Sequence, residues 1–319
     1  MKLTLEEVTV FLTVVDMGSL TAAAEHLGQP VSTTSRLLAR LEEKLQTTLL
    51  RRTTRRLDLT DEGCNFAQDA RQILESVRVA EDRLMARRGR LAGPLHIDAA
   101  SPFMLHVLVP LLPGYRALHP GVDLVLNSNE GFIDLLERRV DLAIRIGELK
   151  DSTLHSRLLG QVRNRLVASP DYLARCGTPA NAEALRAHEL LGFSQPEVLN
   201  LWPLQHADGR AARVQPTLLS SSGETLRQMA IAGMGITYLG DFMTARDIAQ
   251  GRLVEVLPQA TLHKPRPVHA VYHQQSAVSV RIASMVAYLA EAMRAPEAEW
   301  AAYVPPAASK IAGLMEAPR

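Results

Sequence analysis

A cluster of basic residues near the N-terminus has the residue types and spacing to bind phosphate groups. Residues 36–56 hold seven lysines and arginines and two glutamates, so 7 − 2 leaves a local charge of +5, whereas the whole chain carries +1. Such side chains neutralise nucleic-acid phosphates and position a protein on the duplex. Ion pairs with Glu42 and Glu43 are the alternative for any one arginine. We expect phosphate contacts from five of the arginines: Arg40, Arg51, Arg52, Arg55 and Arg56.

One helix inside this cluster has two contrasting faces. In PVSTTSRLLARLEEKL, residues 30–45, Thr34 and the leucines share one arc at about 100° per residue, and the serines and arginines face away. An α-helix fits the major groove of DNA, where an arginine can pair with both acceptors of a guanine. A merely solvated polar face is the alternative. The candidates for base contact are Ser32, Thr33, Ser35 and Arg36.

Two further helices are expected before this one. Residues 4–17 repeat apolar side chains at helical spacing, and Thr4 with Glu7 forms a capping box at the N-terminal end. Gly18 supplies the C-terminal stop. Thr21 is then expected to cap a second, short helix whose small residues permit close packing.

A wing and a long helix are expected next. The segment TTLLRRTTRRLDLT, residues 47–60, is typical of two β-strands with arginines at their turn. Three short helices and such a wing predict a winged helix-turn-helix over residues 1–60, with the helix-turn-helix at about 19–38. Residues 61–88 predict one long helix that links this domain to the rest of the chain.

The linker helix carries a coiled-coil seam. Its apolar residues alternate steps of four and three, a period near 3.5. A lone helix has nothing to bury that seam against, so a second copy of the chain is the expected partner. The seam consists of Phe66, Ala70, Ile73, Val77, Ala80 and Leu84.

The remaining chain alternates strand and helix patterns. LHIDAAS and VDLVLNS predict strands, with a helix between them, and DLAIRIG predicts another strand after a second helix. The segment SSSGETLRQMAIAGMGITYL repeats the order of helix and strand. This alternation predicts an α/β domain with a mainly parallel sheet over residues 89–295. Residues 296–319, rich in alanine and proline, are expected to form a loosely held tail.

Motifs in this order resemble the LysR-type transcriptional regulators. FLTVVDMGSLTAAAEHLG, SRLLARLEEKL and RRTTRRLDLTDEG carry the resemblance first, and GPLHIDAAS, ERRVDLAIRIG and GETLRQMAIAGMGI extend it to about residues 3–293. The start IDAA and the segment SPDYLA, residues 169–174, are most similar to one branch of that family. Pro30 and Gln46 depart from the family pattern, in which a small polar residue and a helix-ending glycine are usual.

The resemblance implies a two-lobe effector domain similar to periplasmic solute-binding proteins. Lobe I is expected at about 92–160 and 266–295, and lobe II at about 161–265. Ligands collect at the carboxyl ends of strands, and helix N-termini attract anions. Ser101 as a helix cap and Arg145 as a bidentate clamp would suit a small organic anion, unless they are only a cap and an ion pair. The full set of candidates is Ser101, Pro102, Asn129, Arg145, Phe193, Ser222 and Thr237.

Several function classes lack support in the sequence. No Walker loop, GxGxxG or nucleophile and base at motif spacing is present, and the histidines show no metal-ligand spacing. We therefore expect no enzyme activity, no metal and no cofactor. Cys64 and Cys176 form no CxxC pair, and the N-terminus lacks the pattern of a secretory signal. With no apolar run near the roughly 20 residues of a membrane span, these features predict a protein of the cytoplasm.

The leading hypothesis is a transcription factor that responds to a small-molecule effector. The resemblance implies a homotetramer, built as a dimer of dimers, on double-stranded operator or promoter DNA, with RNA polymerase as a further candidate partner. A solute-binding or transport component is the alternative, because the two-lobe domain alone would permit it. A redox sensor through the two cysteines is a weaker alternative.

Overall fold

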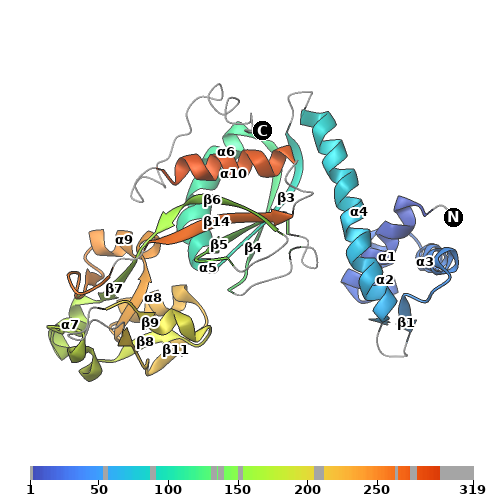
Figure 1. The fold of residues 1–319 in the computed structure, drawn as a ribbon. Helices are drawn as coiled ribbons and strands as arrows, with labels where there is room; N and C mark the ends of the chain where they lie inside the picture. Colours follow the sequence, from blue (N-terminus) through green and yellow to red (C-terminus); the bar gives the residue numbers. More distant parts are fainter. Residues whose placement is uncertain are drawn as a thin grey trace. The chain divides into compact units, whose positions relative to one another are not determined.

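The computed structural model separates near residue 90 into two compact units (Figure 1). It describes residues 3–52, 57–86, 91–130, 135, 140–149, 154–204, 212–262, 265–273 and 279–294. The expected tail lies outside the described residues, as does the second helix of the α/β domain, at about 131–140, apart from residues 135 and 140. No helix in the described ranges is long and apolar enough to cross a membrane.

The N-terminal unit has the expected order of three helices, a hairpin and a long helix. The elements are α1 (Leu5–Met17), α2 (Leu20–His26), α3 (Val31–Leu45), β1 (Leu50–Arg52), β2 (Leu57–Leu59) and α4 (Asp61–Ala86). The capping box of Thr4 and Glu7 is confirmed, and Gly18 ends α1 at a φ of 62°. The predicted cap of α2 is wrong by two residues: Ser19, not Thr21, accepts the hydrogen bond from the Ala22 N–H. β1 and β2 pair antiparallel to form the wing.

Helix α4 packs its first turns onto the core of this unit. Ala67 and Ala70 are buried with Phe11, whose ring lies 5.3 Å from that of Phe66. Gly63 permits the approach, because a Cβ at this position would lie 2.1 Å from the carbonyl oxygen of Leu49. The expectation that the α4 seam has nothing to pack against within the chain is therefore wrong for its first half.

The second half of the α4 seam lies at the surface. Ile73 is 41% exposed and Leu84 is 64% exposed, and Ala80 is exposed as well. Val77 is half-buried. Only this half of the seam is open to a partner.

The C-terminal unit contains two five-stranded sheets, one in each lobe. The first has the order β4-β3-β5-β14-β6 and the second has the order β11-β8-β12-β7-β13. The strands of the first are β3 (Ala92–Ala99), β4 (Gly121–Ser128), β5 (Leu142–Ile146), β6 (Leu154–Val162) and β14 (Arg266–His273). Those of the second are β7 (Asn164–Ala168), β8 (Leu190–Phe193), β11 (Leu218–Ser220), β12 (Ile236–Gly240) and β13 (Val254–Glu255). A separate ribbon pairs β9 (Leu201–Trp202) with β10 (Ala212–Arg213).

Each sheet is parallel in one half and antiparallel in the other. β4, β3 and β5 are parallel, as are β11, β8 and β12, but β14 and β6 pair antiparallel, as do β7 and β13 with their neighbours. The expected mainly parallel sheet is thus wrong for these strands. The reason is that β7 and β14 each enter their sheet directly from a strand of the other lobe, β7 from β6 and β14 from β13, and run opposite to the strands on both sides.

Helices cover the sheets and complete their hydrophobic cores. They are α5 (Ser101–Phe103), α6 (Val109–Leu118), α7 (Pro170–Cys176), α8 (Gly223–Ile231), α9 (Asp241–Ala249) and α10 (Val280–Ala292). Figure 1 shows α6 and α10 together over the first sheet. Tyr115 of α6 and Tyr288 of α10 are buried there, with ring centroids 5.4 Å apart.

A π-helical turn, Met104–Leu108, joins α5 to α6. Pro110 has no N–H, so it cannot give the carbonyl of His106 its ordinary helical hydrogen bond. The Val109 N–H instead bonds to the carbonyl of Met104, five residues back. The helix therefore widens at His106, which is a residue of the contact between the two lobes described below.

Candidate DNA-binding and effector-binding sites

Helix α3 presents the predicted polar face to the surface. Ser32 and Arg36 are exposed, Thr33 and Ser35 are half-buried, and Leu38 and Leu41 are fully buried in the core with Thr34. Pro30 stands at the N-cap position in an extended conformation and offers no side-chain cap. Arg36 forms no ion pair with another described residue, so its guanidinium has no anionic neighbour within the described part of the chain.

Arg40 has a different environment from Arg36, because a buried carboxylate holds it. Its Nε lies 3.2 Å from Oε1 of Glu7, and Lys44 Nζ lies 2.7 and 2.8 Å from the two carboxylate oxygens. Burial alone would raise the pKa of Glu7, but the hydrogen bonds from Lys44 and Thr4 outweigh burial and lower that pKa. The Oε1 atom of Glu42 accepts from the N–H groups of Leu49 and Leu50, and among the described residues Glu42 forms no ion pair with an arginine.

The wing supplies the remaining predicted arginines. Arg51 is exposed on β1, where its backbone is in register with Asp58 of β2, and Arg52 ends the strand. Arg55 and Arg56 lie outside the described residues.

In lobe I, three polar side chains from the ends of adjacent strands converge. Arg145 Nη1 lies 2.8 Å from Oδ1 of Asp98, which is fully buried, and the Asn129 side-chain amide donates to Oδ2 of the same carboxylate. Arg145 Nη1 also donates to the carbonyl of Ile144 at 3.1 Å. Its Nη2 is buried and has no hydrogen-bond partner within the described part of the chain. The bidentate clamp expected from Arg145 is therefore incomplete, because its Nη1 donates to the Ile144 carbonyl and forms an ion pair with Asp98.

Pro102, Phe193 and the start of α8 lie together where lobe I meets lobe II. A Cβ on Gly223 would lie 3.2 Å from Cγ of Pro102 and 3.5 Å from Cζ of Phe193. Ser222 is the N-cap residue of α8 and makes no side-chain cap hydrogen bond. The capping role expected for Ser101 is wrong, because Ala100 holds the N-cap position and Ser101 is the first helical residue.

Thr237 lies apart from that group. It is near the start of β12, in register with Leu191 of β8, and not at the carboxyl end of the strand. Its hydroxyl is buried and finds no hydrogen-bond partner among the residues that the structure describes.

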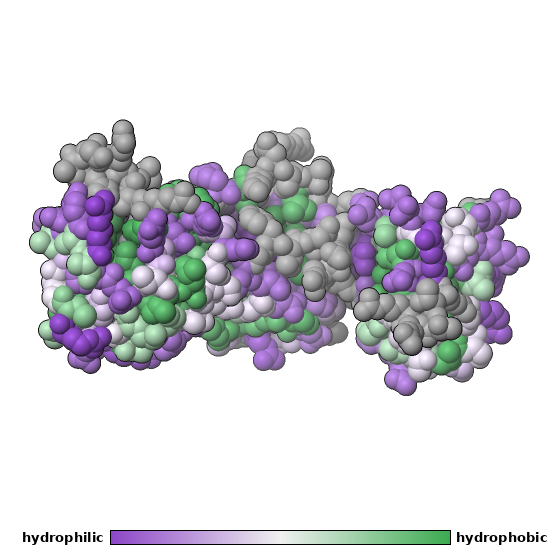
Figure 2. Space-filling view, turned by 90° about the horizontal axis from the view of Figure 1, so that it is seen from below, coloured by the Kyte–Doolittle hydropathy of each residue, from purple (hydrophilic) through white to green (hydrophobic). Residues whose placement is uncertain are grey.

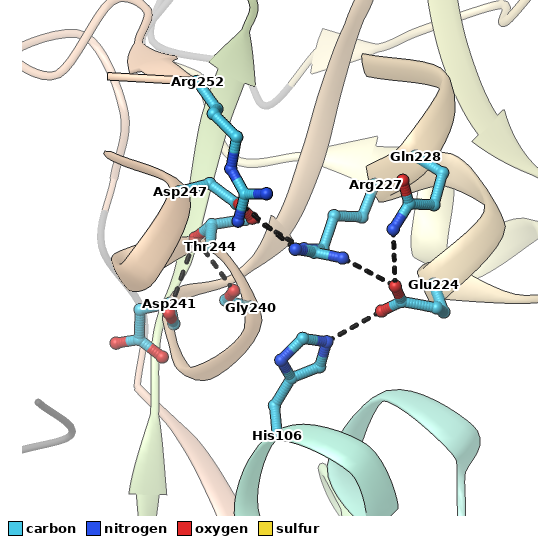
Figure 3. Close-up of polar contacts among 9 residues, drawn as sticks. All are labelled: His106, Glu224, Arg227, Gln228, Gly240, Asp241, Thr244, Asp247 and Arg252. Carbon is cyan, nitrogen blue, oxygen red and sulfur yellow. Dashed lines mark hydrogen bonds and ion pairs between the residues drawn. The ribbon is translucent and has the colours of Figure 1, made fainter. Parts of the chain in front are cut away.

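A chain of charged residues from both lobes was missed by sequence reasoning (Figure 3). His106 Nε2, on the π-helical turn of lobe I, lies 2.7 Å from Oε2 of Glu224 on α8 of lobe II. The other oxygen of Glu224 accepts from Arg227 Nη1 at 2.6 Å. Arg227 also pairs with the fully buried Asp247 of α9, which contacts Arg252 in turn. The ring pair of Phe103 and Phe242, with centroids 5.6 Å apart, adds an apolar contact between the lobes.

The residues in this row of contacts stabilise the charged forms of their neighbours. Burial would raise the pKa of Glu224, but hydrogen bonds from His106 and Gln228 and the charge of Arg227 outweigh burial and lower it. Burial would lower the pKa of Arg227, but Asp247 and Glu224 raise it overall. The sequence does place Glu224 in the first turn of a predicted helix, where acidic residues are favoured. Nothing in the sequence, however, pairs Glu224 with a histidine 118 residues away.

Other candidate chemistry is sparse among the described residues. No group of three or more histidine, cysteine, aspartate and glutamate side chains there is placed to hold a metal ion. Cys64 and Cys176 are both exposed and free.

The winged helix-turn-helix, the long helix and the two-lobe α/β domain define a DNA-binding regulator with a ligand-binding domain. Comparison with known proteins agrees: residues 5–64 match the family described as "Bacterial regulatory helix-turn-helix protein, lysR family", and residues 88–294 match the LysR substrate binding domain. The chain belongs to the LysR family of transcriptional regulators. Members of this family bind DNA and small-molecule effectors. The alternative of a transport component is not supported, because the matches include the DNA-binding domain.

Individual relatives are similar over most of the chain. The HTH-type transcriptional regulator CrgA of Neisseria meningitidis is 44% identical over 291 residues, which cover 91% of this chain and 97% of that protein. The solved structure of CrgA from Neisseria meningitidis superposes with a TM-score of 0.63 at 43% identity, over 92% of this chain and 99% of that one. Full-length AphB, a virulence activator of Vibrio cholerae, gives a TM-score of 0.56 at 26% identity, over 91% and 99% of the two chains.

Proposed function

We propose that this regulator contacts operator DNA through the exposed face of α3 and the arginines of the wing. Ser32, Thr33, Ser35 and Arg36 would meet base edges, and the wing arginines would meet phosphates. The observation that carries the proposal is the contrast between the two faces of α3: Leu38 and Leu41 are buried, while Arg36 is exposed and has no ion-pair partner among the described residues. Such a protein would act in the cytoplasm, where bacterial DNA lies.

Substitutions of single arginines test this division of roles. A duplex selected by the purified protein from a random pool serves as operator, and a scrambled duplex of equal length serves as control. Arg36→Ala should weaken binding of the selected duplex by roughly 1 to 3 kcal/mol and narrow its advantage over the scrambled one. Arg55→Ala should weaken both and reduce the salt slope by about one unit. Equal losses on both duplexes from both substitutions would contradict the assignment.

We propose further that the chain assembles as a dimer of dimers in which the second half of α4 forms one contact. Ile73 and Leu84 are exposed there without apolar cover. Other large apolar side chains, Leu105, Val109 and Leu219, are exposed on the C-terminal unit, and Figure 2 shows hydrophobic patches among the hydrophilic residues on one face of the molecule. Exposed apolar patches commonly mark interaction surfaces.

Charge placed on α4 tests the assembly. Ile73→Asp would bury an unpaired carboxylate in the proposed contact, which is costly. Sedimentation should then show a smaller species that binds the selected duplex weakly, whereas Gln72→Asp, on the neighbouring exposed position, should not alter the assembly. An unchanged oligomer in Ile73→Asp would remove this part of α4 from the interface.

We propose a small organic anion as the effector, with one carboxylate oxygen on Arg145. The support is the buried Nη2 of Arg145, which lacks a partner among the described residues, together with the N-terminus of α8, where Ser222 makes no side-chain cap. Pro102 and Phe193 would contact the apolar part of the ligand. Because Asp98 compensates the charge of Arg145, the anion would receive one charged hydrogen bond from this residue, not two.

A panel of organic acids, amines and neutral metabolites tests the ligand class on the full-length protein. Acids should raise the unfolding temperature of the effector domain more than amines or neutral compounds do. Arg145→Lys keeps a cation beside Asp98 but removes the second donor arm, so it should abolish most of the response to acids. Stabilisation by amines alone, or an undiminished acid response in Arg145→Lys, would contradict the proposal.

A further inference from the structure

Glu7 is a buried anion at the junction of α1 and α3. Its carboxylate accepts from the Thr4 N–H at 3.0 Å and from Lys44 at 2.7 and 2.8 Å, and it pairs with Arg40 at 3.2 Å. The residue is fully buried, and three donor groups compensate its carboxylate. Sequence reasoning gave it only the role of a helix cap, but the capping box uses a small part of what this carboxylate contacts.

The cations that Glu7 holds belong to one stripe on α3. Arg36, Arg40 and Lys44 follow one another at intervals of four residues, so they share one face of the helix. Arg36 is exposed and forms no ion pair with a described residue. The Arg40 side chain is 60% exposed although Glu7 holds its Nε, and the Lys44 side chain is only 20% exposed. The stripe therefore contains one cation without an acidic partner among the described residues, one whose Nε is held by Glu7, and one that is largely enclosed.

We propose that Glu7 is a specificity-determining residue for DNA binding. Its carboxylate tethers Arg40 and Lys44 to α1 and so limits the phosphate contacts that α3 can make on any sequence. Phosphate contacts strengthen binding without regard to sequence, whereas base contacts discriminate. With Arg40 tethered, the contribution of Arg36 forms a larger share of the binding free energy. The inference rests on α3 being the helix that meets DNA, as proposed above.

Glutamine at this position removes the charge with little change in shape. A capping box accepts glutamine as well as glutamate, so the hydrogen bond from the Thr4 N–H is kept. Without the carboxylate charge, Arg40 loses its ion-pair partner and its long side chain is able to turn outward to a phosphate. Glu7→Gln therefore removes the charge of Glu7 but keeps its role in the capping box at the start of α1.

The direction of the change in DNA binding distinguishes a role in specificity from a purely structural role. Loss of a structural residue weakens binding to every duplex. Release of Arg40 should instead strengthen binding to a scrambled duplex several-fold and steepen its salt slope by about 0.9, the value for one further phosphate. The selected duplex, whose register is fixed by base contacts, should gain less, so the ratio of the two dissociation constants should fall.

Fluorescence anisotropy with the full-length protein tests this at several salt concentrations. The variants are Glu7→Gln, Arg40→Gln, the double variant and Arg36→Ala, each on a selected and a scrambled duplex. Glu7→Gln should bind the scrambled duplex more tightly, and the double variant should return to the wild-type slope. Equal weakening on both duplexes with an unchanged slope, or a double variant that behaves like Glu7→Gln, would overturn the inference.

Arg40→Gln keeps the inference testable if Glu7→Gln fails to fold. Because Arg40 is tethered in the wild type, its removal alone should leave the salt slope on the scrambled duplex unchanged. A slope reduced by about 0.9 would show that Arg40 already contacts phosphate and would overturn the proposal. Arg36→Ala distinguishes failure of the DNA-binding proposal from failure of the inference about Glu7. If Arg36→Ala binds the selected duplex as well as the wild type does, the DNA-binding role of α3 is contradicted. If Arg36→Ala weakens that binding but Glu7→Gln has no effect, only the role of Glu7 is contradicted.

Discussion

The two units each contain a fully buried carboxylate that holds an arginine for which the sequence predicted a ligand. In the N-terminal unit Glu7 holds Arg40, and in lobe I Asp98 holds Arg145. The two pairs differ in whether a buried polar atom remains without a hydrogen-bond partner. Glu7 is bonded by the Thr4 N–H, by Lys44 and by Arg40, whereas the Asp98 pair leaves the buried Nη2 of Arg145 without a partner in the described part of the chain.

This difference separates a structural junction from a candidate ligand site. A fully satisfied buried carboxylate fixes two helices against each other and leaves nothing for a ligand to complete. A buried donor without a partner carries an unfavourable free energy that a ligand could relieve. Four experiments with substituted proteins test these assignments.

Asp98→Asn should have the largest effect. It leaves the guanidinium of Arg145 buried without its counter-charge, which typically costs about 3 to 5 kcal/mol. Denaturant unfolding of the full-length protein should show this loss in the transition of the effector domain. Asp123→Asn, on the exposed part of β4, is the matched control and should change stability by less than about 0.5 kcal/mol. Similar stabilities of the two variants would show that Arg145 does not depend on Asp98.

Glu7→Gln should lower the stability of the N-terminal unit by about 1.5 to 3 kcal/mol at neutral pH, as expected for lost hydrogen bonds to a charged group. Because the pKa of Glu7 is lowered in the folded state, its contribution is fully present above the ordinary value of 4.5 and is lost as the pH falls through the lowered pKa. The difference between wild type and variant should therefore shrink in acid. Glu6→Gln, one residue away and exposed, should show no such pH dependence.

The contact between His106 and Glu224 should be weaker, since both side chains are partly exposed. A double-mutant cycle of His106→Ala and Glu224→Ala should give a coupling of about 1 kcal/mol in the stability of the effector domain. The coupling should decline as acid protonates Glu224, because the lowered pKa of this residue means that the folded state favours its charged form. A coupling near zero at neutral pH would exclude this pair as a link between the lobes.

Gln46→Gly should give the smallest effect and the opposite sign. Gln46 ends α3 at a φ of 52°, a left-handed conformation that costs a residue with a Cβ about 1 kcal/mol. Glycine should therefore stabilise the N-terminal unit by about 0.5 to 1 kcal/mol, while Gly18→Ala, at a φ of 62°, should destabilise it by a similar amount. A destabilised Gln46→Gly would mean that the glutamine side chain supports the wing.

The local features of the fold could be predicted from the sequence. The capping box, the glycine stop, the two faces of α3 and the start of α4 depend on residues a few positions apart. The cap of α2 was misplaced because Ser19 and Thr21 are both good N-cap residues and lie two positions apart. The antiparallel halves of the sheets were missed, since direct strand connections between lobes leave no pattern in the strands themselves.

The partners of the charged residues could not be predicted. Glu7 and Lys44 are 37 residues apart, and His106 and Glu224 are 118 apart, so periodicity carries no information about either pair. Asp98 could have been noticed as an acidic residue near the end of a predicted strand. Without the fold, however, the position of Arg145 beside it was only one of several possible ion pairs.

Arg36 is proposed to meet a guanine edge, while Glu7 holds Arg40 away from the DNA. The most direct test replaces each guanine of a selected duplex in turn by 7-deazaguanine, which removes the N7 acceptor that arginine uses in the major groove. At one position the replacement should weaken binding of the wild-type protein by about 1 kcal/mol or more, and it should have no further effect on Arg36→Ala. Arg40→Ala should remain as sensitive to that position as the wild type. If every replacement weakens the wild type and Arg36→Ala equally, Arg36 does not read a base and the account of α3 is contradicted.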